Sequence, residues 1–417
     1  MINSLDYAVQ CDASDPLKAY RNHYIFPQHQ GKDAVYFLGN SLGLPLKTTA
    51  ESLGDVVAQW GSFGVEGFFE GERPWWHLNE ELSKALMPVV GGKASEIVCM
   101  NALTVNLHLL FVSFYRPTAA RYKIVCEEKA FPSDQYLIKS QLAWHGYDPN
   151  SALLEVSKKK EHWDTAVFID TIETHASSIA MVFLGGVNYY NGQHLDIPAI
   201  TAAAHKHNIV VGWDLAHAVG NVPLSLHDWG VDFAAWCSYK YLNGGPGAVG
   251  GAFVHQKHHN SNLSRLAGWW GHDKKSRFEM PDTFLPEQGA AGWEISTPSI
   301  LSLTPLLSAL KQREAIGPER LFEKQEKLTA YLEFVIENIL EETPAHIEII
   351  TPKARGSQLT LLLHKNGQHL FKSLQDQGIM VDWREPDAMR MAPVPLYNSF
   401  QDVYRFGHAL KKALLLC

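Results

Sequence analysis

Lys240 occupies a position that is unusual for a lysine. It lies in "DFAAWCSYKYLNGGPGAVGGAFV", between an apolar run that ends at Ser238 and a glycine-rich stretch that begins at Gly244. Burying an ammonium group is costly unless the charge is paired or lost. A lysine that loses its charge in an apolar pocket is a nucleophilic amine, which can form a Schiff base with a carbonyl group. The alternative is a lysine that extends from a strand end into solvent, and this segment alone leaves both interpretations open.

A second segment supplies a carboxylate that matches this lysine. "HNIVVGWDLAHAVG" predicts a buried strand over Ile209–Trp213 that places Asp214 at its carboxyl end, with His217 three residues later. Open α/β sheets bind ligands at the carboxyl ends of their strands. A strand-end lysine and carboxylate suit pyridoxal 5'-phosphate (PLP), whose aldehyde reacts with the amine while the acid keeps the ring nitrogen protonated. The alternatives are a helix N-cap for Asp214 and a core position for His217.

Two further strand-to-helix junctions could hold a phosphate and a ring. In "IVCMNALTVNLHLLFVSF", the amides of Leu103 and Thr104 would point at an anion at a helix start. In "AFPSDQY", Phe131 could stack on a pyridine ring and Asp134 could orient a ring substituent or a histidine. Each segment has a plainer alternative, a Thr N-cap in the first and a Pro-Ser-Asp helix start in the second. The "GGPGAVGG" stretch matches neither the P-loop nor the dinucleotide fingerprint, which disfavours a nucleotide site.

The order of the predicted elements indicates how these residues come together. Apolar, β-branched runs are expected to form strands over Glu96–Cys99, Tyr122–Glu127, Ser151–Val156, Ile179–Leu184, Ile209–Trp213, Phe233–Ser238 and Gly251–Val254. Helical patterns alternate with them over Thr48–Phe63, Glu80–Val90, Thr104–Phe114, Ser133–Trp144, Trp163–Glu173 and Ile197–His207. This alternation predicts an α/β fold, a mostly parallel sheet with helices on both faces. A smaller α+β domain with strands near Ile347–Ile350 and Gln358–Leu363 is expected to follow.

Length and composition predict a soluble globular protein of two domains. The chain has 417 residues, which is more than one hydrophobic core usually accommodates. Its residues are 46% hydrophobic and 19% charged, as in soluble globular proteins. We expect an N-terminal arm over 1–45 that joins the small domain, a large domain over 46–300 and a small domain over 301–417. A formal net charge of -8 without charge blocks disfavours nucleic-acid and membrane partners. Five widely spaced cysteines suggest neither disulfides nor a zinc site, and no signal or membrane segment is evident, so the cytoplasm is expected.

Taken together, the chain resembles the kynureninases, which are PLP-dependent hydrolases of fold type I, the aspartate aminotransferase-like enzymes. The resemblance covers nearly the whole chain. It rests on these segments: "YFLGNSLGLPL", "NALTVNLH", "AFPSDQY", "DLAHAVGNVPLSLHDWGVDFAAWCSYKYLN", "LAGWWGH", "GWEISTPSIL" and "MRMAPVPLYNSF". It implies cleavage of L-kynurenine, and of 3-hydroxykynurenine as a further substrate, to anthranilate or 3-hydroxyanthranilate and L-alanine.

The resemblance also assigns site residues. Lys240 and Tyr239 would be catalytic, and Arg390 would bind the α-carboxylate of the amino-acid substrate. PLP would be held by the following residues: Leu103, Thr104, Phe131, Pro132, Ser133, Asp134, Tyr190, Asp214, His217, Tyr239, Lys240, Trp269 and Thr297. A homodimer with shared sites is implied, in which Trp269 and Thr297 reach a neighbour's phosphate, and no metal is implied.

The chain departs from the family pattern at three places, and other functions stay open. Thr297 replaces a common asparagine, Gly185 replaces a serine of some members, and "GVEGFFEGERPWW" lacks a histidine that some relatives use near the substrate ring. Another fold-type I PLP enzyme, such as a cysteine desulfurase or an aminotransferase, would share Asp214 and Lys240. A metal hydrolase is poorly supported because His205 and His207 do not share a helix face. A non-catalytic binding protein on the same scaffold is the third alternative.

Overall fold

A seven-stranded sheet forms the larger part of the molecule. The computed structural model describes residues 1–343 and 346–415. The strands are β4 (Ile97–Cys99), β5 (Lys123–Glu127), β6 (Leu153–Val156), β7 (Ile179–Gly185), β8 (Val210–Asp214), β9 (Phe233–Trp236) and β10 (Gly251–Val254). Their order across the sheet is β4-β10-β9-β8-β7-β5-β6. The ladders from β6 to β9 are parallel, whereas β10 runs antiparallel to both β9 and β4. The carboxyl ends of β4, β5, β7, β8 and β9 therefore share one edge of the sheet.

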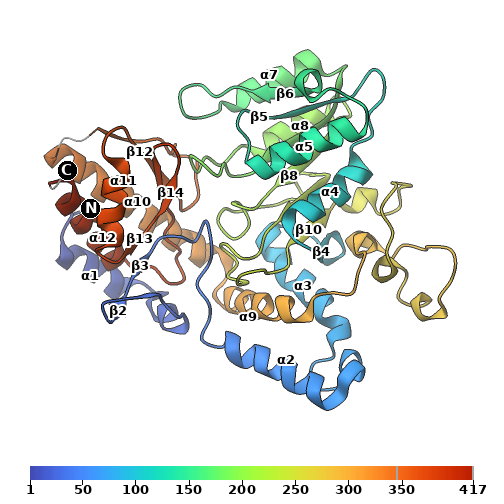
Figure 1. Ribbon diagram of the computed structural model, residues 1–417, viewed down its shortest axis with the longest axis horizontal. Coiled ribbons are helices and arrows are strands. Elements are labelled where there is room, and N and C mark those ends of the chain that lie inside the picture. The colour runs from blue at the N-terminus through green and yellow to red at the C-terminus, as the bar shows by residue number, and fades with distance from the viewer. Residues whose placement is uncertain (344–345, 416–417) are drawn as a thin grey trace.

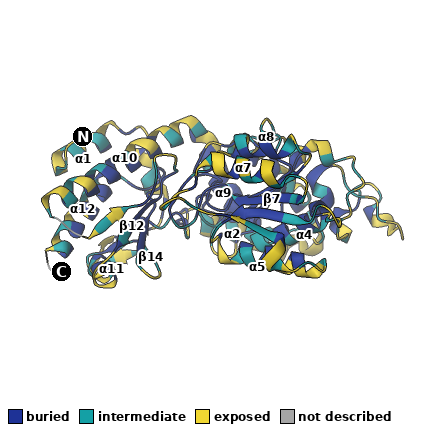
Figure 2. Cartoon of the chain, turned by 90° about the horizontal axis from the view of Figure 1, so that it is seen from above, coloured by how far each residue is buried: buried dark blue, intermediate teal, exposed yellow. Residues whose placement is uncertain are grey.

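Helices cover both faces of this sheet, as the sequence predicted. They are α3 (Leu78–Val90), α4 (Leu103–Phe114), α5 (Pro132–Trp144), α6 (Pro149–Ala152), α7 (Thr165–His175), α8 (Ile197–His205) and α9 (Ile300–Ile316), while α2 (Thr49–Phe63) packs on α9. One apolar core packs side chains of α3, α7, α8 and α9 against the sheet. A second core packs α4 and α5 against the other face. Figure 2 shows the buried strands enclosed between these helices, so the strand-end residues are held on a rigid support.

A second group of elements gathers both ends of the chain (Figure 1). A four-stranded antiparallel sheet has the order β11-β12-β15-β14, with β11 (Ile347–Ile349), β12 (Leu359–Leu363), β14 (Asp382–Arg384) and β15 (Ala388–Met391). The helices are α10 (Pro318–Glu342), α11 (Gly367–Gln375), α12 (Phe400–Leu414) and the N-terminal α1 (Leu5–Ser14). A hairpin of β1 (Gln28–His29) and β2 (Lys32–Asp33) follows α1, and β3 (Val35–Tyr36) pairs in parallel with β13 (Ile379–Met380).

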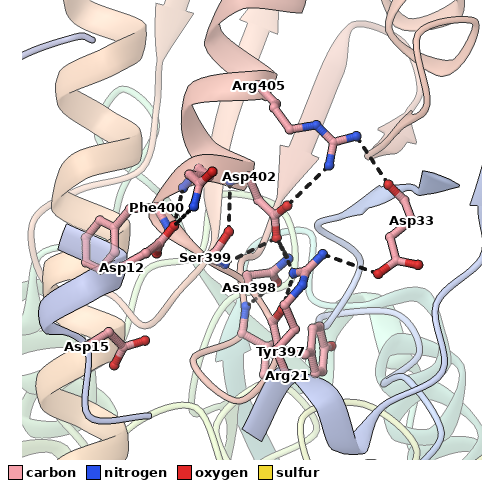
Figure 3. A network of polar contacts seen from close by, with 12 residues as sticks. Asp12, Asp15, Arg21, Asp33, Tyr397, Asn398, Ser399, Phe400, Asp402 and Arg405 are labelled. Carbon is pink, nitrogen blue, oxygen red and sulfur yellow. Dashed lines mark hydrogen bonds and ion pairs between the residues drawn. The ribbon is translucent and has the colours of Figure 1, made fainter. Parts of the chain in front are cut away.

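Polar contacts fasten the N-terminal segment to α12 (Figure 3). The Asp12 carboxylate on α1 accepts hydrogen bonds from the amides of Phe400 and Gln401, at 2.7 and 3.1 Å. These amides belong to the first turn of α12, where backbone donors lack partners within the helix. Arg21 donates to the Asp402 carboxylate at 2.6 Å. The N-terminal segment is thereby anchored before it continues towards residues 36–46.

The observed element bounds follow the sequence predictions with local differences. The predicted strand Ser151–Val156 begins with the short helix α6, because Asp148 caps a helical turn that starts with Pro149. The predicted helix Trp163–Glu173 starts at Thr165, since Asp164 caps it. Helix α9 packs against α2 and against α3, and α3 in turn covers a face of the larger sheet. The domain boundaries proposed from the sequence stay predictions.

Within the described residues, no helix combines the length and the apolar character needed to span a bilayer. Cys99, Cys126 and Cys237 are buried free thiols, and Cys11 is a partly buried one. Cys417 lies outside the described residues.

Candidate functional site

The loops that leave the shared sheet edge enclose a cavity of about 400 Å³. The polypeptide segments after β4, β5, β7, β8 and β9 all contribute to its wall. Ten residues that the sequence analysis assigned to the site line it: Leu103, Thr104, Phe131, Ser133, Asp134, Asp214, His217, Tyr239, Lys240 and Arg390.

The candidate amine and acid come from neighbouring strands. Asp214 is the last residue of β8, and Lys240 lies four residues after the end of β9. These strands pair in parallel, with Asp214 opposite Ala235. Asp214 is buried and Lys240 is half-buried, and both line the cavity. Lys240 and Asp214 therefore contribute to the wall of the same cavity.

Two aspartates share this end of the cavity. Burial raises the pKa of Asp214, while hydrogen bonding by the Ala216 amide at 2.7 Å and the charge of Lys240 oppose the increase. The pKa of Asp134 is raised further, by burial and by the charges of Asp214 and Glu127. Because like charges cannot both ionise cheaply in a buried site, the larger increase in the pKa of Asp134 favours a proton on Asp134 rather than on Asp214.

His217 and Ser238 provide polar atoms without protein partners. The Nδ1 atom of His217 and the hydroxyl of Ser238 are buried, and neither has a hydrogen-bond partner within the described part of the chain. Burial and the charge of Lys240 lower the pKa of His217 well below its ordinary value, so its imidazole is neutral. Buried polar atoms in proteins are normally paired. The unpaired Nδ1 of a cavity-lining histidine is what a site for a polar ligand requires.

Two helix starts form a candidate phosphate cradle. Leu103 and Thr104 are the first residues of α4, whose N-cap residue Ala102 offers no side-chain hydrogen bond. The Thr104 hydroxyl lies 2.7 Å from the hydroxyl of Ser133, in the first turn of α5. Helix N-termini present free amides and a positive dipole end, which favour anions. The pair of hydroxyls and amides fits a phosphate group.

The opposite wall comes from the four-stranded sheet and the N-terminal segment. Arg390 on β15 is 1% exposed, forms an ion pair with Asp382 and donates to the carbonyl oxygen of Tyr189. Its Nε has no partner in the described residues. Arg384 also lines the cavity and lies 3.1 Å from the same aspartate. Two guanidinium groups thus face the sheet edge that carries Lys240.

An aromatic pair lies beside the acids. The ring of Phe131 meets the ring of Tyr189 edge to face, with centroids 5.1 Å apart. Both residues line the cavity. Phe131 is 41% exposed, so one of its sides is open to stack on a planar ligand.

Four residues assigned from the sequence do not line this cavity. Pro132 starts α5 behind Phe131, and the Tyr190 hydroxyl lies 3.5 Å from Asp387. Trp269 is 44% exposed, and its indole N–H donates to the carbonyl oxygen of Arg277. Thr297 lines a separate pocket of about 230 Å³. The roles of these four residues stay predictions.

The cavity also contains residues that the sequence analysis did not single out. These are Asn40, Ser41, Ala102, Glu127, Val187, Tyr189, Ala216 and Arg384, and they are joined by Gly185, which was named above only as a departure from the family pattern. Glu127 carried a usable signal, since it ends a predicted strand as Asp214 nearly does. Asn40 and Ser41 lie in "YFLGNSLGLPL", a segment noted for its resemblance without a role. Arg384 carried no comparable signal.

One histidine and carboxylate cluster lies outside the cavity. Glu96, His227 and His255 each place a potential ligand atom within 4.8 Å of the others. The Glu96 carboxylate already accepts from the Gln256 amide and from His227, at 2.8 and 2.9 Å. The Nδ1 of His255 accepts from the Lys257 amide at 3.1 Å. Because protein groups occupy these atoms, the cluster supports chain packing and gives no argument for a metal ion.

Comparisons with known proteins identify one family. A family model described as the kynureninase C-terminal domain matches residues 321–410. A protein named kynureninase from Flavobacterium psychrophilum is 51% identical, with 99% of each chain covered. Another of that name from Myxococcus xanthus is 48% identical over 98% of each chain. Among solved structures, the cysteine desulfurase CsdA from Escherichia coli matches with a TM-score of 0.77 at 16% identity, covering 95% of this chain and 98% of that one. A cystine C-S lyase, C-DES, matches with a TM-score of 0.75 at 17% identity, over 91% and 97%. The structural matches show the shared fold.

Proposed function

The chain belongs to the kynureninase family, and we propose that the residues of this cavity carry out its reaction. The protein hydrolyses L-kynurenine to anthranilate and L-alanine with PLP as cofactor. The observation that carries the site assignment is the placement of Lys240 and Asp214 at the ends of adjacent strands, in one enclosed cavity. The fold shared with cysteine desulfurases does not favour that alternative, because those structures are only 16% identical to this chain.

The residues present fit PLP. When bound, PLP supplies an amine-reactive aldehyde conjugated to a ring that accepts electrons. Lys240 would hold the aldehyde, Asp214 the ring nitrogen, and the starts of α4 and α5 the phosphate. The unpartnered Nδ1 of His217 is available to a polar ring substituent.

The chain's own groups would then move the protons. Lys240 would remove the proton from the substrate α-carbon. Tyr239, beside it, acts as acid and base at the side-chain carbonyl and at the β-carbon. Burial raises the pKa of the Tyr239 hydroxyl, which keeps it protonated and able to donate. Water adds to the carbonyl carbon, the bond between the β- and γ-carbons breaks, the hydroxyl stays with anthranilate, and the β-carbon of alanine receives a proton.

A direct assay tests the proposed activity. The purified protein supplied with PLP and L-kynurenine should release anthranilate, followed by its fluorescence, and alanine in equal amounts. Parallel assays with 3-hydroxykynurenine determine whether the ring-hydroxylated compound is a second substrate, as we also propose. Release of sulfide from cysteine without any anthranilate would instead support a desulfurase.

Arg390 is the proposed clamp for the substrate α-carboxylate. A guanidinium group can hold a carboxylate with two parallel hydrogen bonds. Removing one partner of such a buried charged pair costs roughly 2–5 kcal/mol, so Arg390→Ala should raise KM for kynurenine at least about 30-fold. Arg390→Lys should restore little, because an ammonium group cannot form the bidentate pair.

The control for this prediction is Arg73→Ala, which alters an arginine with a 46% exposed side chain. Circular dichroism of each variant establishes that the fold is retained. An Arg390→Ala enzyme that folds normally and has the KM of the unmodified protein would exclude the clamp.

We further propose a homodimer in which Trp269 and Thr297 complete the partner's phosphate site. In support, both residues lie away from the cavity of their own chain. Exposed apolar side chains also lie near Trp269: the ring of Phe278 is 5.5 Å from the ring of Trp269, and Phe69 packs against Phe278. Exposed apolar patches commonly mark association surfaces. Sedimentation velocity tests the assembly, and a monomer under assay conditions would contradict it.

A cytoplasmic location is also proposed. Its support is that the buried cysteines of the described chain are free thiols, as in reducing compartments. Cell fractionation tests the location.

A further inference from the structure

Glu127 is a third carboxyl group in the cavity wall. It ends β5, two strands away from Asp214 at the end of β8, and β7 lies between them. Gly185 of β7 is paired with Asp214, and Val125 of β5 is paired with Val182. Glu127, Gly185 and Asp214 therefore form a row along the edge of the sheet. Glu127 is 4% exposed and lines the cavity.

The hydrogen bonds to this carboxyl group come from neutral backbone. The Gly185 amide donates to both carboxyl oxygens of Glu127, at 3.3 and 3.4 Å. A Cβ atom at Gly185 would lie 3.0 Å from Oε1, so the glycine leaves just enough room for the carboxyl group. Two long amide contacts compensate poorly for a buried negative charge. The neutral acid is therefore the form that this environment favours.

The groups that face Glu127 reinforce this preference. Asp134 from α5 and Asp214 from β8 are acidic, and Tyr189 follows β7. Lys240, after β9, partly opposes the increase in the pKa values of Asp214 and Asp134. Burial raises the pKa of Glu127 to about 7, the charge of Asp214 adds to the increase, and the amide hydrogen bonds oppose it.

We propose that Glu127 is a positioning residue that keeps its proton while PLP is bound, so that Asp214 is the ionised carboxyl group of the row. The inference rests on the proposed function, because it takes Asp214 as the partner of the ring nitrogen. A proton on Glu127 limits the negative charge beside the ring. When Glu127 loses this proton at alkaline pH, a second negative charge is added to that of Asp214. This second charge stabilises the protonated forms of nearby nitrogen atoms. The visible absorption of the bound cofactor should therefore titrate in two coupled steps.

Glu127→Gln tests the proposal because glutamine keeps the shape and removes the proton equilibrium. The visible absorption of the loaded variant should titrate in one step, with its apparent pKa lower than in the unmodified enzyme by roughly one pH unit. Glu127→Asp keeps a carboxyl group and should retain both steps. Glu155→Gln is the matched control, because it neutralises an exposed glutamate on the neighbouring strand β6.

Thermal stability gives a second readout that does not depend on activity. The folded-state pKa of Glu127 lies above the ordinary 4.5, so its stabilising contribution is complete below pH 4.5 and is lost as the pH rises through about 7. The melting temperature of Glu127→Gln relative to the unmodified enzyme should therefore rise between pH 5 and pH 8. Glu155→Gln should show no such trend.

The possible results separate this inference from the proposed function. Titration curves of Glu127→Gln that superimpose on those of the unmodified enzyme, with an equal melting difference at pH 5 and pH 8, would overturn the role of Glu127. If the glutamine variant does not fold, the visible absorption of the unmodified enzyme and of Glu127→Asp decides the question. Two titration steps in both proteins support the role of Glu127, and a single step in both overturns it. An unmodified protein that never acquires visible absorption with PLP would refute the cofactor assignment, while the melting comparison would still decide the protonation of Glu127.

Discussion

Lys240→Ala is expected to lower kcat for kynurenine cleavage by roughly 10⁴-fold, the upper end of what one positioned acid–base group contributes. The side chain has two proposed tasks, holding the cofactor aldehyde and moving the α-proton, and alanine can perform neither. The protein should still fold, because Lys240 lies in a loop after β9 and is only half-buried. Anthranilate release under single-turnover conditions measures the chemical step without interference from product release.

Lys160→Ala serves as the matched control, since Lys160 is exposed and does not line the cavity. It should leave kcat and KM unchanged. An external amine of small size should partly restore proton transfer in Lys240→Ala and not in the control. A folded Lys240→Ala enzyme with kcat within about threefold of the unmodified protein would show that another group performs this chemistry.

Asp214→Asn is expected to lower kcat by roughly 10² to 10³-fold. Asparagine preserves the shape and can still accept from the Ala216 amide, but it cannot balance a protonated ring nitrogen. Breaking a buried ion pair costs about 3–5 kcal/mol, which corresponds to a rate that is lower by at least about two factors of ten. The bound cofactor in Asp214→Asn should also lose its proton at a lower pH than in the unmodified enzyme, which its visible absorption would report.

The comparison for Asp214→Asn uses Asp214→Glu and Asp228→Asn. The glutamate variant keeps the charge and should retain more activity than the asparagine variant. Asp228 is exposed, and its replacement should have no effect on kcat. Equal rates for the unmodified enzyme and Asp214→Asn would mean that the ring nitrogen does not depend on this acid.

Open α/β sheets bind ligands at the carboxyl ends of their strands, and this rule explains how much of the site could be predicted from the sequence. Buried strands were recognisable from short β-branched runs, and residues just beyond them had to meet at one sheet edge. Asp214, Lys240 and Phe131 follow that rule, and the structure places them around one cavity. Glu127 follows the same rule, but the prediction includes it as the last residue of the strand Tyr122–Glu127 and assigns it no role.

The opposite wall could not be predicted in the same way. Arg384 comes from a strand of three residues, β14, and Ser41 follows β3, a strand of two residues. Such short strands carry no periodicity, and β3 meets β13 across more than 300 positions of sequence. Pairing over that distance depends on tertiary packing, which local patterns do not encode. Arg390 was assigned only through the resemblance to a family.

Trp269 and Thr297 illustrate a different limit. Their assignment came from the resemblance, and one chain places them outside its own cavity. A residue that serves a neighbouring subunit carries no mark of this in its own sequence, since its partners lie in another copy. The dimer proposal therefore has to be tested by association.

The bond between Lys240 and the cofactor is tested most directly by chemical trapping. Borohydride should reduce the PLP-loaded enzyme, remove its visible absorption and leave a phosphopyridoxyl group covalently attached. Peptide mass mapping is expected to place this group on Lys240, and the Lys240→Ala enzyme should carry none. A label on another lysine, or a reduced protein without any covalent label, would contradict the assignment of Lys240.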